Sequence, residues 1–168
     1  MRFAPAGLAL SLALAVTASV GISREPEADP RATMLLAEGR AALMAGETQA
    51  AIDSFEAALA VDPAYTPTIL LLAEAARKDG LQGKAIRFYR EALARDPDNL
   101  MAISGEGAAL VEKGAVDKAR RNLAQLESIC GDNCPETQVL AAKIASGPKP
   151  QVLTAEAVMP DAVVTQQN

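Results

Sequence analysis

Glycine recurs at a fixed interval of 34 residues, at Gly46, Gly80 and Gly114. Five further columns keep the same step: Gly39, Ala73 and Gly107; Ala51, Ala85 and Ala119; Phe55, Tyr89 and Leu123; Ala58, Ala92 and Leu126; and Pro63 and Pro97, with Gly131 in the third place. A fixed period of this length is the sequence signature of a repeat array in which each unit is one supersecondary element. Such a unit buries its apolar face only against its neighbours, so we expect stacked units.

Each unit holds two apolar-periodic stretches, clearest in the second copy at residues 66–79 and 82–96. The apolar set of the first stretch follows the i, i+3, i+4, i+7 spacing of an amphipathic helix: Ile69, Leu72, Ala73 and Ala76. Gly80 stands between the stretches, where a left-handed turn suits glycine, and Pro97 follows the second, where it cannot continue a helix. The pattern predicts helical hairpins that turn at the glycine column, with the bulky column of Phe55, Tyr89 and Leu123 filling the space between neighbouring hairpins.

The segments GETQAAIDSFEAALAVDP (46–63) and GLQGKAIRFYREALARDP (80–97) resemble tetratricopeptide repeats, or TPRs. Both segments have an alanine in the second helix, an aromatic residue four positions later and a final proline, as TPRs do. The small residue that TPRs have at the eighth position of the repeat stands before each segment, at Gly39 and Ala73. The resemblance implies three repeats, at about residues 32–63, 66–97 and 100–131. It also implies an all-α, right-handed solenoid of three helix-turn-helix hairpins, as in short secreted bacterial TPR proteins.

Two departures from the TPR pattern are visible. The usual aromatic residue at the fourth position of each repeat is replaced by Leu35, Ile69 and Ile103. The third repeat has Leu123 in place of its second aromatic residue and lacks the final proline. The third repeat is therefore the least typical, as expected near the end of an array.

The last hairpin of a solenoid needs a cover for its apolar face. Residues 135–146 supply a candidate capping helix, in which Pro135 suits the first position and the apolar stripe is Val139, Leu140 and Ile144. We therefore expect a solenoid domain over residues 31–146, preceded by a short linker at 23–30. Residues 147–168 contain three prolines and no strong period, and we expect them to be a disordered tail.

Residues 1–22 have the order of a secretory signal peptide: Arg2, an apolar stretch, then small residues. Cleavage is expected after Ala18, within a few residues, and the mature protein is then expected in the periplasm. The alternative is an uncleaved segment that anchors the protein in the inner membrane, facing the periplasm. Membrane contact is expected only in that case.

Cys130 and Cys134 lie between the last repeat helix and the capping helix. In an oxidising compartment a disulfide across this loop would pin the cap to the array. A redox-active or metal-binding pair, or two free thiols, are the alternatives left open. The spacing C-x-x-x-C differs from the C-x-x-C redox motif, and the chain has no histidine to complete a metal site.

In TPR proteins the first helices of successive repeats line a concave groove where peptides often bind. The resemblance implies these partner-binding positions: Leu36, Arg40, Met44, Leu70, Glu74, Arg77, Met101 and Ser104. Some family members hold a peptide carboxylate with a Lys and Asn clamp, but the corresponding pairs here are Leu36/Arg40, Leu70/Glu74 and Ser104/Ala108. The clamp is therefore absent, and a largely apolar groove with a few charges is expected. The alternative is that these charges are an ordinary solvated helix face.

The composition argues against catalysis. The chain has no histidine, the commonest general base, and no glycine-rich phosphate loop, so no catalytic residue, metal or cofactor is expected. Its formal net charge of −5 gives no electrostatic footprint for nucleic acid.

Three functions remain at this point. The leading one is a periplasmic adaptor or scaffold that binds a peptide or a partner protein in its groove. The second is an assembly factor of the cell envelope, for example in cytochrome c maturation, with a redox-relevant pair at Cys130 and Cys134. The third is a membrane-anchored structural subunit.

Overall fold

The structure is a computed structural model that describes residues 28–148. This part of the chain consists of seven α-helices: α1 (Pro30–Ala45), α2 (Thr48–Val61), α3 (Thr66–Lys78), α4 (Gln82–Arg95), α5 (Leu100–Glu112), α6 (Val116–Cys130) and α7 (Pro135–Ser146). The predicted all-α architecture of helical hairpins is confirmed. The expected signal segment at 1–22, the linker up to residue 27 and the tail from residue 149 lie outside the described residues.

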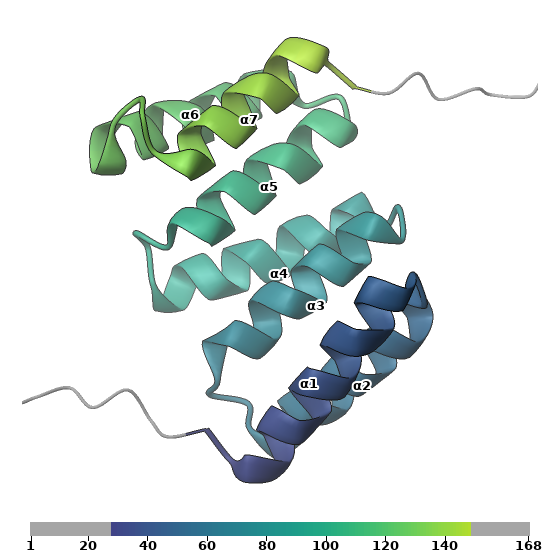
Figure 1. Cartoon of the computed structure of the whole chain (residues 1–168). Coiled ribbons are helices and arrows are strands. Elements are labelled where there is room, and N and C mark those ends of the chain that lie inside the picture. Colours follow the sequence, from purple (N-terminus) through teal and green to yellow (C-terminus); the bar gives the residue numbers. More distant parts are fainter. Residues whose placement is uncertain (1–27, 149–168) are drawn as a thin grey trace, which may run out of the picture.

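The helices form three hairpins that stack side by side. Within the hairpins α1 packs on α2, α3 on α4 and α5 on α6, while α2 meets α3 and α4 meets α5 between hairpins. The first helices α1, α3 and α5 therefore share one layer, with α2, α4 and α6 behind it (Figure 1). The last helix, α7, packs on both α5 and α6 and extends the front layer by one helix (Figure 1).

Each hairpin turns at a glycine of the repeating column. Gly46, Gly80 and Gly114 have φ values of 82°, 76° and 83°, the left-handed region in which a side chain is disfavoured. At the first turn the Glu47 N–H donates to the Ala42 carbonyl and the Gly46 N–H donates to the Leu43 carbonyl. The other two turns repeat this pair of bonds, which is the Schellman arrangement that satisfies the last carbonyls of a helix.

Side-chain caps fix two of the helix starts. The Asp29 carboxylate accepts a hydrogen bond of 2.7 Å from the Arg31 N–H, and the Asn99 side chain accepts one of 3.0 Å from the Ala102 N–H. Pro30 lies at the end of the expected linker and is the first residue of α1, where its lack of an N–H costs nothing.

The core is built from alanines at the close helix contacts and a few large side chains. Phe55 is fully buried, and a Cβ built on Gly39, in the same hairpin, would collide with its ring. The ring of Tyr89 lies against Gly105 of the next hairpin. Tyr89 thus fills the space between neighbouring hairpins, as predicted for its column, and Phe55 packs against the first helix of its own hairpin.

The capping helix α7 packs closely against α5 at one small residue, Gly107. Leu140 is fully buried, and a Cβ added to Gly107 would lie 2.6 Å from its Cδ2 atom. Leu140 joins Ile103 and Leu126 in a small core of its own at this end of the array. Among residues 28–148, no helix combines the length and the apolar character needed to span a bilayer.

Candidate functional site

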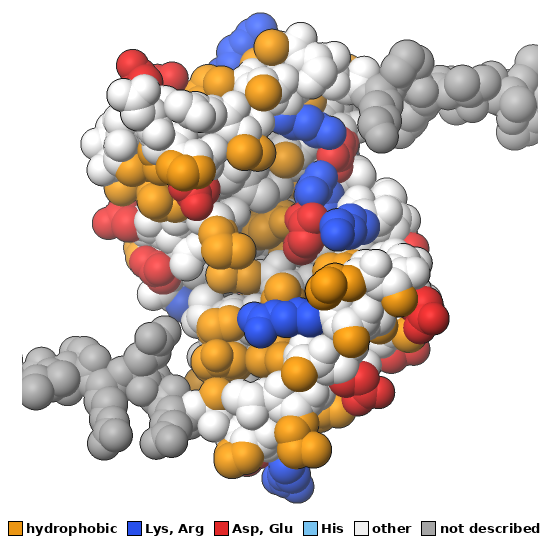
Figure 2. All heavy atoms as spheres, in the orientation of Figure 1, with side chains coloured by type: hydrophobic (Ala, Val, Ile, Leu, Met, Phe, Trp, Pro, Cys, Tyr) orange, Lys and Arg blue, Asp and Glu red, His pale blue; other side chains and the backbone are white. Residues whose placement is uncertain are grey.

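A groove of about 470 Å³ runs across the front layer of helices. It takes residues from α1 (Arg40), α3 (Pro67, Leu70, Leu71, Glu74 and Arg77), α4 (Tyr89), α5 (Met101, Ser104, Gly105 and Ala108) and α7 (Pro135, Glu136 and Val139). Figure 2 shows this face hollowed between the hairpins and lined with hydrophobic side chains, with charged groups beside them. The helix stack thus presents one apolar trough to solvent.

One charged network borders the groove and is neutral within itself. The Arg77 guanidinium donates to both carboxylate oxygens of Glu74, at 3.0 and 2.8 Å, and to Glu112 at 2.7 Å. The Lys143 ammonium lies 2.8 Å from the same Glu112 oxygen, and the Tyr89 hydroxyl donates to Glu74 at 3.0 Å. Two cations and two carboxylates therefore balance, and the network ties α3, α4, α5 and α7 together.

The network shifts the pKa values of two of its members. Burial alone would lower the pKa of the Arg77 guanidinium, but the hydrogen bond and charge of Glu74 and the charge of Glu112 outweigh burial, so this pKa is raised. Burial, helped by the charge of Glu74, raises the pKa of the Tyr89 hydroxyl. Arg77 and Tyr89 therefore keep their protons at every physiological pH and serve as hydrogen-bond donors.

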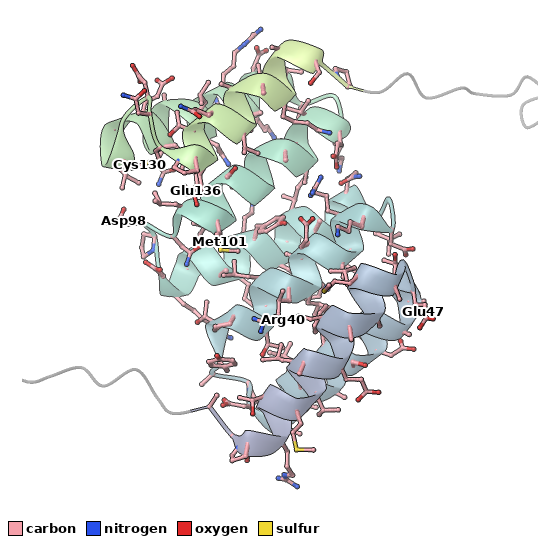
Figure 3. The ribbon with its side chains drawn as sticks, in the orientation of Figure 1. Arg40, Glu47, Asp98, Met101, Cys130 and Glu136 are labelled. Atoms are coloured by element: carbon pink, nitrogen blue, oxygen red, sulfur yellow. A yellow bond between two sulfur atoms is a disulfide. The ribbon has the colours of Figure 1, made fainter. Side chains whose placement is uncertain are left out.

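Two charged side chains of the groove stand apart from this network. Arg40 has no ion pair within residues 28–148, and its side chain extends from α1 across the hollow (Figure 3). Glu136 lies at the other end, on α7, and Met101 lies between them (Figure 3). The groove is therefore apolar along its length, with a cation at the α1 end and a carboxylate at the α7 end.

The structure gathers most, but not all, of the residues that the TPR resemblance pointed to. Six of the eight line the groove: Arg40, Leu70, Glu74, Arg77, Met101 and Ser104. Leu36 does not, because it is only 3% exposed and packs into the core. Met44 does not either, because it is 89% exposed near the end of α1, outside the hollow.

Two of the gathered residues also make contacts within the fold. Arg77, which was expected as a polar contact for a ligand, is paired with Glu74 and Glu112. Ser104 donates its hydroxyl to the Glu136 carbonyl at 3.2 Å, which fastens α5 to α7. Both residues hold the walls of the groove in place.

Sequence reasoning missed the wall that α7 provides, namely Pro135, Glu136 and Val139, and also Leu71, Tyr89 and Gly105. A signal for this wall exists in the period itself. One more step of 34 residues from Pro67 and Met101 reaches Pro135, and all three residues line the groove. The capping helix therefore occupies the place of a fourth first helix.

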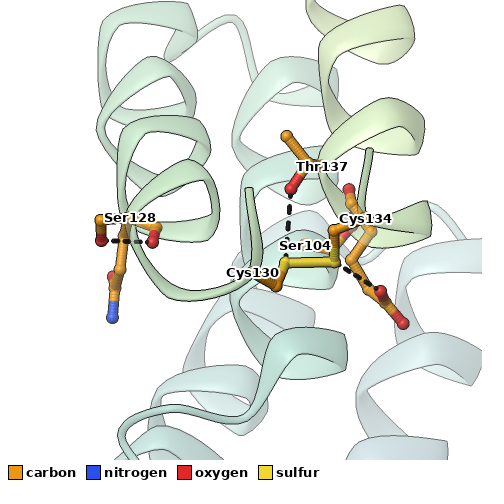
Figure 4. The surroundings of a disulfide bond; sticks show 7 residues. Ser104, Ser128, Cys130, Cys134 and Thr137 are labelled. Carbon is orange, nitrogen blue, oxygen red and sulfur yellow. Dashed lines mark hydrogen bonds between the residues drawn. A yellow bond between two sulfur atoms is a disulfide. The ribbon is translucent and has the colours of Figure 1, made fainter. Parts of the chain in front are cut away.

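The turn between α6 and α7 carries the two cysteines. The structure joins Cys130 and Cys134 through their sulfur atoms, with the Cα atoms 5.7 Å apart (Figure 4). Thr137 Oγ1 lies 3.6 Å from Cys130 Sγ, and since a disulfide sulfur carries no proton, the threonine is the donor. Cys134 is the N-cap residue of α7, so the linkage directly precedes the first turn that supplies Pro135 and Glu136 to the groove.

The described residues contain no group of three or more metal-ligating side chains. Of the two acids in the groove, Glu74 pairs with Arg77, and Glu136 lies beside the disulfide, whose sulfur atoms have no proton to donate to it. The side chains of the groove can therefore make apolar contacts and ion pairs with a ligand.

Several solved structures are similar to this chain, all at low sequence identity. The first TPR domain of Spaghetti (RPAP3), bound to an HSP90 peptide, superposes with a TM-score of 0.63 at 21% identity, over 69% of this chain and 91% of that one. The Sgt2 TPR domain from Aspergillus fumigatus gives 0.63 at 23% identity, over 82% and 93%. The Yersinia enterocolitica type III secretion chaperone SycD, in complex with a peptide of the translocator YopD, gives 0.59 at 20%, over 68% and 86%.

No protein-family model matches the sequence, and no curated protein matches it. The likeness to solved structures extends over two thirds of the chain or more and over most of each neighbour. Stacked hairpins, glycine turns and a groove on the first helices agree with it. This chain has the fold of a tetratricopeptide-repeat domain.

Proposed function

We infer that this chain is a protein-binding scaffold that holds an extended peptide, or an extended segment of a partner protein, in the groove on α1, α3, α5 and α7. The observation that carries this is the groove itself: an open, largely apolar trough on the surface of a well-packed array. An apolar hollow with a few polar groups beside it is the usual form of a ligand-binding site. Two of the similar structures were solved with peptides bound.

The side chains of the groove suit binding better than chemistry. Leu70, Met101 and Val139 offer apolar contacts to a ligand's anchor side chains, and Arg40 and Glu136 offer one charge of each sign. Peptide grooves of this type take affinity from apolar anchors and direction from a few polar contacts. The proposed scaffold therefore binds and presents its partner, and any reaction belongs to that partner.

Two exposed methionines allow a matched test. Met101 lies in the groove and is 61% exposed, whereas Met44 lies outside it and is 89% exposed, so neither supports much of the core. Peptides are selected from a random library displayed on phage, using the full chain as bait, and their dissociation constants are measured by fluorescence anisotropy. Met101→Asp should weaken binding about tenfold or more, since it places a charge among apolar contacts.

Met44→Asp is the control and should leave the dissociation constants unchanged. Equal effects of the two substitutions, or no selected peptide at all, would contradict the proposed function. Circular dichroism of both variants checks that the helices remain.

The proposed scaffold works in the periplasm. Residues 1–22 have the order of a cleavable signal peptide, and an oxidising compartment suits a disulfide between Cys130 and Cys134. The mass of the protein purified from cells tests this proposal. A mature chain that begins at or near Ser19 supports it, whereas a chain that retains residues 1–22 supports membrane anchoring instead.

A further inference from the structure

The chain continues for 20 residues beyond Pro148, and this segment has the chemistry that the groove accepts. Residues 149–168 contain three apolar pairs separated by polar or small residues: Val152 and Leu153, Val158 and Met159, and Val163 and Val164. Two acids, Glu156 and Asp161, lie among them, against one base, Lys149. The segment thus combines apolar anchors with an excess of negative charge.

The groove has a charged residue, Arg40, that an acidic segment could pair with. Arg40 is a cation without an ion pair within residues 28–148, and it borders an apolar floor. The other cation of the groove, Arg77, is already neutralised by Glu74 and Glu112. A carboxylate brought in by a ligand would therefore find its partner at Arg40, at the α1 end.

The length of chain beyond α7 matches the width of the groove. Helix α7 lies at the edge of the front layer, and α5, α3 and α1 follow in order across the face (Figure 1). Packed helices are about 8–10 Å apart, so three steps from α7 to α1 cover roughly 24–30 Å. An extended chain advances about 3.3–3.6 Å per residue, so the eight residues from Pro148 to Glu156 span roughly 26–29 Å.

The apolar anchors fall in a matching position. Leu153 is five residues beyond Pro148, a reach of roughly 16–18 Å, which is close to two helix steps. This distance lets it reach the floor beside Ala108, which lies in the second half of α5, the half nearer the end of α7. Val152 and Leu153 can therefore rest on the floor of the groove while Glu156 approaches Arg40.

We propose that residues 149–168 fold back over the groove of their own chain, with Val152 and Leu153 on the apolar floor and Glu156 paired with Arg40. The segment then acts as an internal competitor that a partner peptide must displace. This proposal rests on the proposed function, because it assigns an occupant to the same groove.

Photo-crosslinking in the full chain tests the placement directly. Ala155→p-benzoylphenylalanine puts the crosslinker between the anchors and Glu156, and mass spectrometry of the irradiated monomer locates the adduct. The expected adducts lie on α1, α3 or α5 of the same chain. A matched variant that also carries Val152→Asp and Leu153→Asp should lose most of this yield, because its anchors no longer suit an apolar floor.

A charge exchange tests the ion pair. Arg40→Glu should lower the yield of the groove adduct about threefold, in keeping with a solvent-exposed pair, and so should Glu156→Arg. The two substitutions together should restore the yield. Loss without restoration would overturn the assigned contact between Glu156 and Arg40.

The remaining outcomes are equally decisive. Adducts that join two chains, adducts confined to the convex helices α2, α4 and α6, or no adduct at all would overturn the proposal. If library peptides still bind the groove in that case, and Met101→Asp still weakens them, the proposed function stands without the internal competitor.

Discussion

Gly105 and Gly107 lie two positions apart on α5 and are small for different reasons. A Cβ on Gly105 would strike the ring of Tyr89, and one on Gly107 would strike Leu140 of the capping helix. Only Gly107 belongs to a repeating column, because every repeat packs its eighth residue closely. Gly105 is small because the ring of Tyr89, in the preceding hairpin, occupies the space that a side chain would need.

Gly105→Ala is expected to destabilise the fold by about 1 to 3 kcal/mol, although alanine favours a helix, because the added methyl group overfills a closed contact. Tyr89 cannot easily move aside, since its hydroxyl is hydrogen-bonded to Glu74. Gly83→Ala is the control: its Cβ would meet only Lys113 Nζ at 3.9 Å, so a gain of up to about 1 kcal/mol is expected. Urea unfolding measures both, and a loss of stability in the control as large as that in Gly105→Ala would contradict the assigned contact.

Because of Tyr89, the free energy of unfolding is also expected to vary with pH in the alkaline range. Burial, helped by Glu74, raises the pKa of its hydroxyl above the ordinary value of 10.0. The folded state then holds this proton more tightly than the unfolded chain does. Its contribution to stability is fully present below about pH 10 and is lost as the pH rises through the folded-state pKa.

The free energy of unfolding is therefore expected to fall above about pH 10, and Tyr89→Phe should flatten that fall. Urea titrations at a series of alkaline pH values provide the measurement. Tyr65→Phe serves as the control, because the Tyr65 side chain makes no hydrogen bond within the described residues. An identical alkaline slope in the wild type and Tyr89→Phe would exclude Tyr89 as its source.

At the scale of the element, α7 does more than cover the last hairpin. Leu140 seats it against Gly107, Lys143 reaches Glu112, and its first turn forms one end of the groove. The linkage between Cys130 and Cys134 closes the short turn that leads into it. The position of this helix therefore decides both the stability of one end of the array and the shape of the site.

Replacing both cysteines, as Cys130→Ser with Cys134→Ser, is expected to lower the free energy of unfolding by about 2 kcal/mol, the entropy of closing a loop this short. Helix content should be retained. Reducing the wild-type protein with dithiothreitol should cause the same loss, while the double variant should not respond. A wild type that is indifferent to the reductant would show that the linkage does not support α7 in solution.

At the scale of the whole molecule, one main core runs through all three hairpins, and each hairpin packs on its neighbours along the chain. The small cluster around Leu140 lies at the α7 end, and Leu93 and Ile144 pack against both clusters. Stability in such an array is approximately a sum over units and their interfaces. The groove, in contrast, draws on four helices and depends on the entire stack.

Phe55→Ala is expected to cost about 3 to 5 kcal/mol, because it leaves a cavity in the first hairpin. The effect should be uneven along the chain: amide hydrogen exchange should rise strongly in α1 and α2 and much less in α5 to α7, which share no contact with them. Exchange followed by mass spectrometry reads out each helix. Uniform loss of protection across all seven helices would contradict an array of separable units.

The sequence alone determined the helices, the hairpins and their turning points. These features are local: an apolar period of 3.6 residues defines a helix, and a glycine with positive φ marks each turn at Gly46, Gly80 and Gly114. The period of 34 residues then predicted that successive hairpins stack on one another. The TPR resemblance supplied most of the groove residues, since side chains on one face follow directly from register.

The packing of the helices in three dimensions sets which charges remain available to a ligand and which helix closes the groove. Arg77 is neutralised by a residue three positions away and by another 35 positions away, while Leu36 turns into the core and α7 enters the front layer. Contacts of this kind depend on the distance and angle between packed helices. A period along the chain fixes where a side chain begins, but the neighbouring hairpin fixes what it meets.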